Sequence, residues 1–215
     1  MSLSRVAVID YGMGNLHSVE SALLHAADCD VVLTSEPKVI AAADRVVFPG
    51  VGAIGDCMAE LKRLGLHEVI HEVIGAGQPL LGICVGMQAL MEGSEESGGT
   101  QGLGLLKGVV QRFPGGLDEQ QRPLKIPHMG WNNVEQTRSH PLWRGIDNHT
   151  RFYFVHSYCV TVASNEVQVG TSTYGVPFTA AVAEQSLFAT QFHPEKSHTA
   201  GLRLLKNFLE WDGTC

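Results

Sequence analysis

The sequence predicts an α/β fold: one domain over residues 1–215, with a mixed, mostly parallel central sheet flanked by helices and antiparallel additions in the C-terminal half. Two patterns support this prediction. In the N-terminal half, short apolar runs alternate with stretches whose apolar residues recur at helical spacing, which is typical of βαβ units. Past residue 92, several strand-like stretches follow one another with a single helical pattern at the end, which favours antiparallel pairing.

The apolar patterns also assign the elements in order. In the N-terminal half we expect strands at 5–10, 31–34, 45–48 and 79–83, helices at 16–27 and 85–91, and one or two helices within 56–75. In the C-terminal half we expect strands at 108–113, 151–162, 167–173, 178–183 and 187–192, then an amphipathic helix at 199–211. Asn15 is a candidate N-cap for the first helix. No internal repeat or linker divides the chain, so a single domain is expected.

Composition limits the classes of function. Of the 215 residues, 44% are hydrophobic and 17% are charged, as in an ordinary soluble globular domain. The formal net charge of -7 repels phosphate backbones, so we expect no binding to nucleic acid. The N-terminus lacks the apolar segment of a signal peptide, and no run approaches the roughly 20 apolar residues of a membrane span. We therefore expect a cytoplasmic protein that does not bind a membrane.

The cysteines are odd in number and lack the spacing of a disulfide framework, which favours reduced thiols. Cys29, Cys159 and Cys215 lie at a helix end, in an apolar strand and at the terminus, where no special role is indicated. Cys57 receives no role from the sequence. Cys84 differs from all of these because of the residues around it.

Cys84 lies between two glycines where a buried strand meets a helix, in the stretch Gly82 to Gln88. This pattern is typical of a nucleophile elbow, a tight turn that projects the nucleophile into a cleft. The helix N-terminus favours a thiolate, and the backbone NH of Val85 points to where an oxyanion would form. The alternative is an ordinary buried cysteine at a Gly-rich strand end.

A base for this cysteine is predicted at the end of the last strand, in the stretch Gln191 to Ser197. His193 and Glu195 are two residues apart, so in extended backbone their side chains share one face. The carboxylate could then hold the imidazole tautomer while the other ring nitrogen faces the thiol. The alternative is a solvated turn before the final helix.

A third component follows the third strand, in the stretch Phe48 to Gly52. The carboxyl ends of parallel strands meet at one edge of a sheet, so this loop is expected beside Cys84. The glycines around Val51 allow a peptide NH to turn toward a developing negative charge. Taken alone, the stretch is only a Gly-rich turn.

These three pieces, in this order, resemble the class I (triad) glutamine amidotransferase family over essentially the whole chain, which implies its flavodoxin-like sheet and a Cys84, His193, Glu195 triad. More narrowly, the chain is similar to the glutaminase subunits of imidazole glycerol phosphate synthase, from histidine biosynthesis. The narrower likeness is carried by seven stretches: 10–15, 49–52, 84–88, 94–96, 127–132, 152–158 and 193–197. Val85 stands where leucine would be expected, with the same backbone NH.

The resemblance implies roles for further residues. Glutamine would be held by Gln88, Glu96 and the backbone of Ser157 and Tyr158, with the oxyanion near Val51, Gly52 and Val85. A partner, a (β/α)8-barrel cyclase in a heterodimer, would receive the ammonia and lie against Asn15, Trp131, Tyr153, His156 and Lys196. Ordinary rim packing is the alternative for the aromatic residues of that set. No cofactor or metal is expected, because a thiolate and fixed dipoles supply the chemistry.

Two further patterns compete with this interpretation. His67 and His71 frame an HExxH pattern with Glu68 as base, as in zinc hydrolases, but an apolar strand and the elbow separate it from a third ligand. Residues 50–55 match GxGxxG after a strand, as in dinucleotide-binding proteins. Pro49 and the lack of an acidic strand end about 20 residues later weaken that match.

Other functions share the same motifs. A non-catalytic ammonia-channel protein is disfavoured by the intact Cys84, His193 and Glu195. A free-standing amidase or the glutaminase subunit of another synthase, such as that of vitamin B6 synthesis, remains open. The vitamin B6 subunit is expected to differ in its Gly-Gly-Glu oxyanion loop, which the stretch 49–52 does not match.

Overall fold

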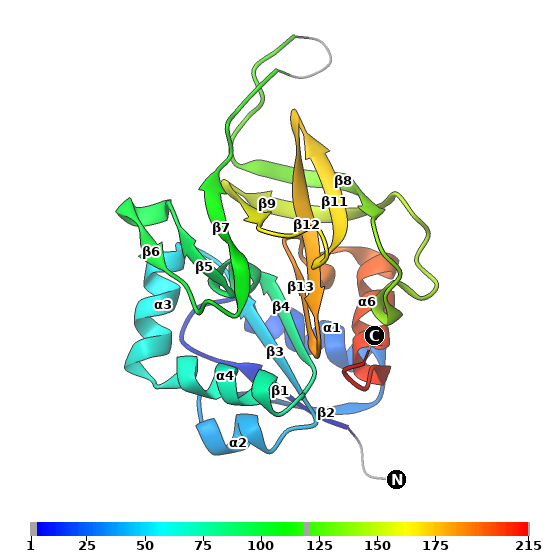
Figure 1. The fold of residues 1–215 in the computed structure, drawn as a ribbon. Helices are drawn as coiled ribbons and strands as arrows, with labels where there is room; N and C mark the ends of the chain where they lie inside the picture. The colour runs from blue at the N-terminus through cyan, green and yellow to red at the C-terminus, as the bar shows by residue number, and fades with distance from the viewer. Residues whose placement is uncertain (1–3, 118–120, 215) are drawn as a thin grey trace.

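The computed structural model describes residues 4–117 and 121–214 (Figure 1). The first half contains β1 (Ser4–Ile9), α1 (Leu16–Ala26), β2 (Cys29–Thr34), α2 (Pro37–Ala41), β3 (Arg45–Gly50), α3 (Ile54–Arg63), α4 (Leu66–Gly75), β4 (Leu80–Cys84) and α5 (Val85–Ala89). The middle contains β5 (Met91–Ser94), η1 (Glu96–Gly98), β6 (Thr100–Gln101), β7 (Leu106–Arg112), β8 (His128–Gln136), η2 (Pro141–Trp143) and β9 (Thr150–His156). The last part contains β10 (Tyr158–Val162), β11 (Gln168–Tyr174), β12 (Val176–Glu184), β13 (Leu187–Thr190), η3 (Pro194–Lys196) and α6 (His198–Glu210).

The strands form one mixed sheet in the order β2-β1-β3-β4-β13-β12-β10-β7-β5-β6. The first five of these strands are parallel, and β12, β10 and β7 continue the sheet with antiparallel pairings. An arm formed by β11, β8 and β9 branches from β12 and extends away from the helices (Figure 1). The predicted α/β class and mixed sheet are confirmed.

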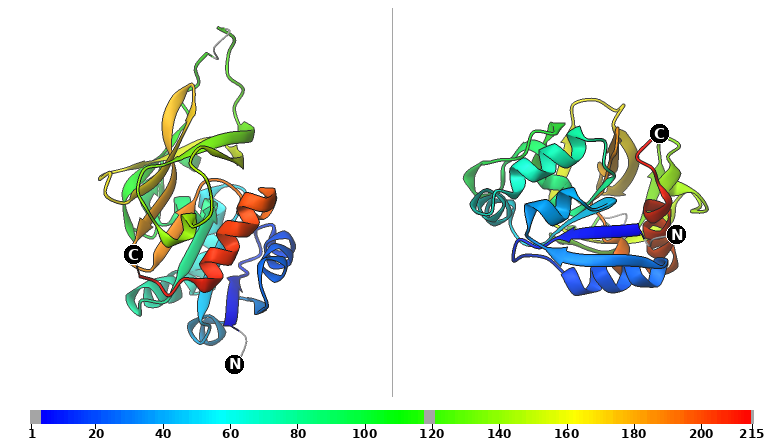
Figure 2. Two further views of the ribbon diagram at one scale, coloured as in Figure 1. Left: turned by 90° about the vertical axis from the view of Figure 1, so that its right-hand side faces the viewer. Right: turned by 90° about the horizontal axis from the view of Figure 1, so that it is seen from below.

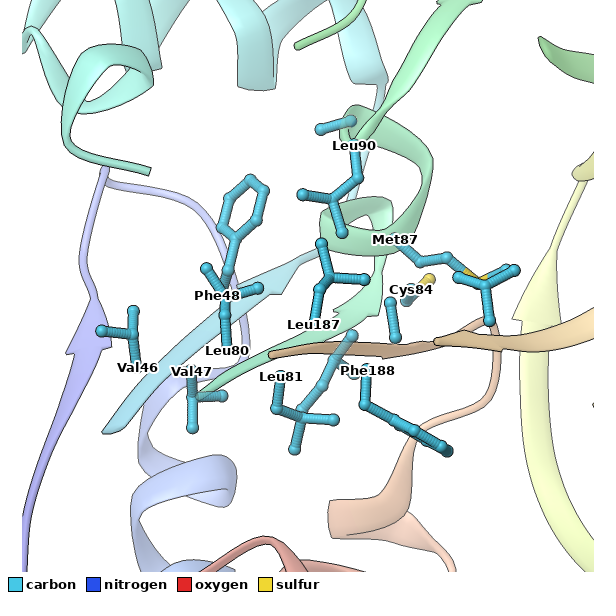
Figure 3. Packing of buried hydrophobic residues seen from close by; sticks show 14 of the residues in the cluster. Val46, Val47, Phe48, Leu80, Leu81, Cys84, Met87, Leu90, Leu187 and Phe188 are labelled. Atoms are coloured by element: carbon cyan, nitrogen blue, oxygen red, sulfur yellow. The ribbon is translucent and has the colours of Figure 1, made fainter. Parts of the chain in front are cut away.

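Helices cover both faces of the parallel part of the sheet. α1 packs against α6, while α3 packs against α4 and α5. Figure 2 shows α1 and α6 on one side of the parallel strands and α3 and α4 on the other. Phe48 points to the face of the strands on which Leu90, at the end of α5, lies, whereas Val47, Leu81 and Phe188 point to the other face (Figure 3). All five side chains are fully buried, so both faces contribute to the core.

The sequence pattern predicted the last strand, at 187–192, but not which strand it pairs with. β13 comes from the C-terminal half but pairs in parallel with β4, with Thr190 opposite Ile83. The crossing brings the segment that follows β13 to the same sheet edge as the segment that follows β4. This pairing positions the candidate site.

Several expected elements have different bounds. The stretch 56–75 is two helices, because Gly65 adopts a left-handed conformation between them. The strand expected at 151–162 is interrupted at Ser157 and forms β9 and β10, and the helix expected at 85–91 ends at Ala89. Asn15 occupies the N-cap position of α1, but its side chain makes no capping hydrogen bond. Strands β5, β6 and β8 and the short α2 were not expected.

Within the described residues, no helix has the length and apolar character needed to cross a membrane. Four cysteines, Cys29, Cys57, Cys84 and Cys159, are free and buried, and Cys215 lies outside the described residues. Burial raises the pKa of Cys57 to about 11, partly opposed by a hydrogen bond with Tyr11, and burial raises that of Cys159 to about 11. Cys57 therefore packs in the core beside Tyr11.

Candidate active site

Three strand ends meet at one edge of the sheet. Gly50, the last residue of β3, is in register with Cys84, the last residue of β4. Thr190, the last residue of β13, pairs with the residue before Cys84. The cysteine, the Gly-rich loop after β3 and the histidine segment after β13 therefore come together, although they lie far apart in the sequence.

Cys84 forms the tight turn between β4 and α5. Its φ of 54 and ψ of -108 lie outside the helix and strand regions, which is strained backbone for a residue with a side chain. Gly86 allows α5 to approach β3: a Cβ there would lie 2.0 Å from the carbonyl oxygen of Phe48. Cys84 therefore stands at the end of β4, where the chain turns into α5 (Figure 3).

Cys84 lies in the wall of a pocket of about 260 Å³. The pocket is lined by Val51, Gly52, Cys84, Val85, Gln88, Glu96, Pro127, Val155, His156, Ser157, Tyr158 and His193. All ten residues that the sequence singled out for chemistry or substrate binding are in this set or bonded to it, counting Glu195 through His193. Apolar walls with a few convergent polar groups are typical of a small-molecule site.

His193 and Glu195 form a buried pair. Nδ1 of His193 lies 2.8 Å from Oε1 of Glu195, and both side chains are 1% exposed. The backbone is extended at His193 but turns through η3 directly afterwards, so Glu195 returns to the ring from a turn rather than from an extended strand. The carboxylate fixes Nδ1 as the protonated nitrogen.

Hydrogen bonds with Ser197 and Tyr153 hold the backbone of His193 in place. Ser197 Oγ donates a hydrogen bond of 2.6 Å to the carbonyl oxygen of His193 and accepts one of 3.0 Å from the backbone NH of Tyr153. The NH of His193 in turn donates to the carbonyl oxygen of Tyr153. β9 therefore holds the histidine backbone at two points.

The electrostatics of His193 favour its charged form. Burial lowers the pKa of the imidazole, but the Cys84 sulfur and the Glu195 carboxylate outweigh burial and raise it to about 10. Nε2 is buried and makes no hydrogen bond of normal geometry within the described residues. A proton taken from Cys84 can therefore reside on His193, giving a thiolate and an imidazolium side by side.

The loop after β3 is fixed at its base. Tyr11 OH donates a hydrogen bond of 3.0 Å to the carbonyl oxygen of Pro49. Gly52 has a φ of +90, a conformation that favours glycine, and with Val51 it lines the pocket next to Val85. The three residues expected near an oxyanion thus surround the same space as the sulfur.

The residues expected to hold a substrate have defined partners. Gln88 Nε2 donates to the carbonyl oxygen of Tyr158 at 3.2 Å and to Gln191 Oε1 at 3.0 Å. Glu96 Oε2 accepts a hydrogen bond of 2.9 Å from the NH of Ile54, the first residue of α3. The carboxylate therefore joins the pocket wall to the helix that follows the loop 50–52.

Comparison with known proteins agrees with this geometry. The model of the family Glutamine amidotransferase class-I matches residues 7–211. The chain belongs to this family. Among its relatives, the imidazole glycerol phosphate synthase subunit HisH of Methylococcus capsulatus is 59% identical over 213 residues, which cover 98% of each chain. The HisH subunit of Pseudomonas putida is 57% identical over 211 residues, covering 98% of this chain and 99% of the relative.

Solved structures show the same fold at low identity. PurLQS from Thermotoga maritima gives a TM-score of 0.74 at 18% identity, covering 97% of this chain and 99% of that chain. The glutaminase domain of CTPS from Trypanosoma brucei gives a TM-score of 0.64 at 18% identity, covering 96% and 91%. The class I glutamine amidotransferase architecture thus extends over nearly the whole chain.

Four of the residues expected toward a partner of this amidotransferase lie at or near the surface. Trp131 is 37% exposed and stacks on His198 with ring centroids 5.0 Å apart. The ring of Tyr153 packs edge-on against the ring of Trp131. Lys196 Nζ lies 5.9 Å from the centre of the Tyr153 ring. Asn15 is half-buried.

His156 requires a correction, because its side chain is not at this surface. It is 5% exposed, and its Nδ1 lies 2.8 Å from the carbonyl oxygen of Tyr158. A carbonyl only accepts, so Nδ1 carries the proton and Nε2 accepts from Nδ1 of His128, 2.9 Å away. Nε2 of His128 then accepts from Asn132 Nδ2 at 3.4 Å. The ring lines the amidotransferase pocket and is part of a buried relay with His128.

The HExxH alternative gains no third ligand. His67 and His71 lie on α4, which packs against α2 and α3, and neither lines the pocket. Across residues 4–117 and 121–214, no group of three His, Cys, Asp or Glu side chains is arranged to hold a metal ion.

Sequence reasoning missed Gln191, Ser197 and His128 as parts of the site. Gln191 is two residues before His193, so the spacing that linked His193 to Glu195 could have indicated it as well. Ser197 and His128 lie in the stretches 193–197 and 127–132 that carry the family likeness, but the sequence does not show that they contact His193 and His156.

Proposed function

We propose that this protein is the glutaminase subunit of imidazole glycerol phosphate synthase, acting in histidine biosynthesis, with residues 1–215 as one glutaminase domain. The observation that carries the proposal is that Cys84 and His193 line the same pocket, with His193 hydrogen-bonded to Glu195. The relatives at 57% and 59% identity, aligned over nearly their full length, give the subunit.

In the proposed reaction, the Cys84 thiolate attacks the carbonyl carbon of the glutamine side-chain amide. His193 Nε2 gives its proton to the amide nitrogen, the C–N bond breaks, and ammonia leaves a γ-glutamyl thioester on Cys84. His193 then takes a proton from water, which attacks the thioester. Glutamate leaves, the thiolate is restored, and the proton stays on His193.

The pocket residues take complementary roles. The backbone NH groups of Val51, Gly52 and Val85 are the proposed donors to the oxyanion, where losing one donor typically costs about 3 kcal/mol of transition-state stabilisation. The Glu96 carboxylate suits the ammonium group of glutamine. Gln88, Ser157 and Tyr158 supply amide and backbone groups for the rest of the substrate.

The proposed partner is a (β/α)8-barrel cyclase that forms a heterodimer with this chain. It would use the ammonia to convert PRFAR to imidazole glycerol phosphate and AICAR, in the cytoplasm. Ammonia released into water is mostly protonated and no longer a nucleophile, so a sheltered path to the acceptor is needed. The partner would lie against Asn15, Trp131, Tyr153 and Lys196.

The oxyanion loop would be completed only when the cyclase has bound its own substrate. Glutamine would then not be hydrolysed without an acceptor for the ammonia.

The test uses the purified complex with the barrel cyclase. Cys84→Ala should lower glutamine-dependent product formation about 10⁴-fold or more, while product formation from ammonium salts continues. Cys159→Ala, in β10 and outside the pocket, is the control and should keep both activities. Glutamine turnover by Cys84→Ala within tenfold of the parent would reject the nucleophile. Failure of the chain to bind the cyclase, with binding to another synthase instead, would reject the subunit assignment.

A further inference from the structure

A chain of amide groups leads from the rim of the pocket to the sulfur. The carbonyl oxygen of Tyr158 accepts from Gln88 Nε2, and the same nitrogen donates to Gln191 Oε1. Gln191 Nε2 lies 3.7 Å from Cys84 Sγ, within hydrogen-bond reach of a sulfur acceptor. The four residues belong to β10, α5, the segment after β13 and the end of β4.

The direction of each hydrogen bond in this chain is determined. A backbone carbonyl only accepts, so the group of Gln88 that faces Tyr158 is its NH₂. That NH₂ has a second hydrogen, which is directed to Gln191, so the atom of Gln191 facing Gln88 is its oxygen. The NH₂ of Gln191 must then face Cys84. The sulfur therefore meets a donor rather than an acceptor.

Burial makes this arrangement significant. Gln191 is fully buried and Gln88 is 4% exposed. A buried amide costs free energy unless its groups are hydrogen-bonded, and an apolar side chain would fill the same space at lower cost. The amide nitrogen of Gln191 has the sulfur as its hydrogen-bond partner among the described residues. Packing alone gives no reason for an amide here.

We propose that Gln191 is a positioning residue for the nucleophile: its side-chain NH₂ aims and stabilises the Cys84 thiolate, and Gln88 holds Gln191 in the orientation that this requires. The inference deepens the proposed function and rests on it. When Cys84 loses its proton to His193 Nε2, the sulfur becomes a full acceptor, and its hydrogen bond from Gln191 strengthens. In the thiol form, Cys84 Sγ also has a distant acceptor in the carbonyl oxygen of Val155, at 4.0 Å.

Other titratable groups act on the sulfur from neighbouring elements. His193, after β13, holds its positive charge beside it, with Glu195 behind the ring. Tyr11, in the loop after β1, is buried, which raises the pKa of its hydroxyl so that it stays neutral. His156, at the end of β9, stays neutral because burial lowers its pKa to about 3.

The experiment measures alkylation of Cys84 by iodoacetamide as a function of pH, with the modified peptide identified by mass spectrometry. The test variant is Gln191→Met, which keeps the length of the side chain and removes its donor. Its alkylation midpoint should move upward by about one pH unit, and its rate at pH 7 should fall about tenfold. The matched control is Gln168→Met in β11, whose amide bonds Thr179 away from the pocket and which should leave the profile unchanged.

A second variant tests the orienting step. Gln88→Met frees the amide of Gln191 to turn, so its midpoint should move in the same direction by a smaller amount. This variant also decides the matter if Gln191→Met does not fold. A folded Gln191→Met protein, or in its place a folded Gln88→Met protein, with the parental alkylation profile would overturn the inference. Alkylation needs no glutamine, so a failure of the proposed function would instead appear as absent glutamine turnover with the profile shifted as described.

Discussion

Gly201 in α6 lies against the carbonyl oxygen of Pro194, so closely that a Cβ on Gly201 would be 1.8 Å from that oxygen. Pro194 stands between His193 and Glu195, and the contact therefore sets how near the final helix can come to the buried pair. Such an approach is open only to glycine.

Gly201→Ala should displace the turn that carries His193 and Glu195. A shift of about 1 Å at a reacting group can cost about 100-fold in rate, so we expect a loss of glutamine turnover of that order with the fold retained. Gly75→Ala is the matched control, because no heavy atom lies within 4 Å of a Cβ there. Steady-state kinetics on both variants checks this; full turnover by Gly201→Ala would mean that the turn tolerates the displacement.

Glu96 has two separable tasks. Glu96→Gln keeps an acceptor oxygen for the NH of Ile54 but loses the charge proposed to meet the substrate ammonium, so KM for glutamine should rise roughly 10- to 100-fold with little change in stability. Glu96→Ala should in addition lower the free energy of unfolding by about 1 kcal/mol, because the first turn of α3 loses its acceptor.

The control for this pair is Glu92→Gln, since Glu92 bonds the NH of Gly108 and does not line the pocket. Kinetics and urea denaturation of the three variants separate the two effects. An unchanged KM in Glu96→Gln would remove Glu96 from substrate recognition.

The relay of His128 and His156 predicts a pH dependence of stability. Burial lowers the pKa of His128 to about 4 and that of His156 to about 3, below the value near 6.5 expected in the unfolded chain. Below about pH 6.5 the two histidines therefore bind more protons in the unfolded state than in the folded state. The free energy of unfolding consequently falls as the pH drops toward 4.

His128→Gln should make this acid dependence shallower by up to about one proton per molecule. Urea denaturation at a series of pH values between 4 and 7 measures the slope. A slope equal to that of the parent protein would show that His128 titrates normally in the folded state.

The sequence was sufficient for the fold class and for the motifs, because each motif is local. The elbow around Cys84 and the pair His193 and Glu195 are contained in short stretches with their own chemical logic. The residues named for the pocket lie together because the carboxyl ends of parallel strands meet at one edge. What made this possible for His193 is the parallel pairing of β13 with β4, which no local pattern encodes.

The remaining parts of the site depend on long-range packing. His156 lies on the buried face of β9 with Phe152 and Phe154, so a residue expected toward a partner is part of a buried relay. Gln191 gained its place at the sulfur through Gln88, a residue more than a hundred positions earlier in the chain. Such pairings are set by the tertiary fold rather than by periodicity or turn chemistry.

The covalent step can be observed directly. The complex is mixed with glutamine, quenched in acid during turnover, digested and analysed by mass spectrometry for a γ-glutamyl adduct. The account predicts an adduct on the peptide that contains Cys84, and predicts that the adduct is abolished in Cys84→Ala. An adduct on a different residue, or full glutamine turnover without Cys84, would contradict it.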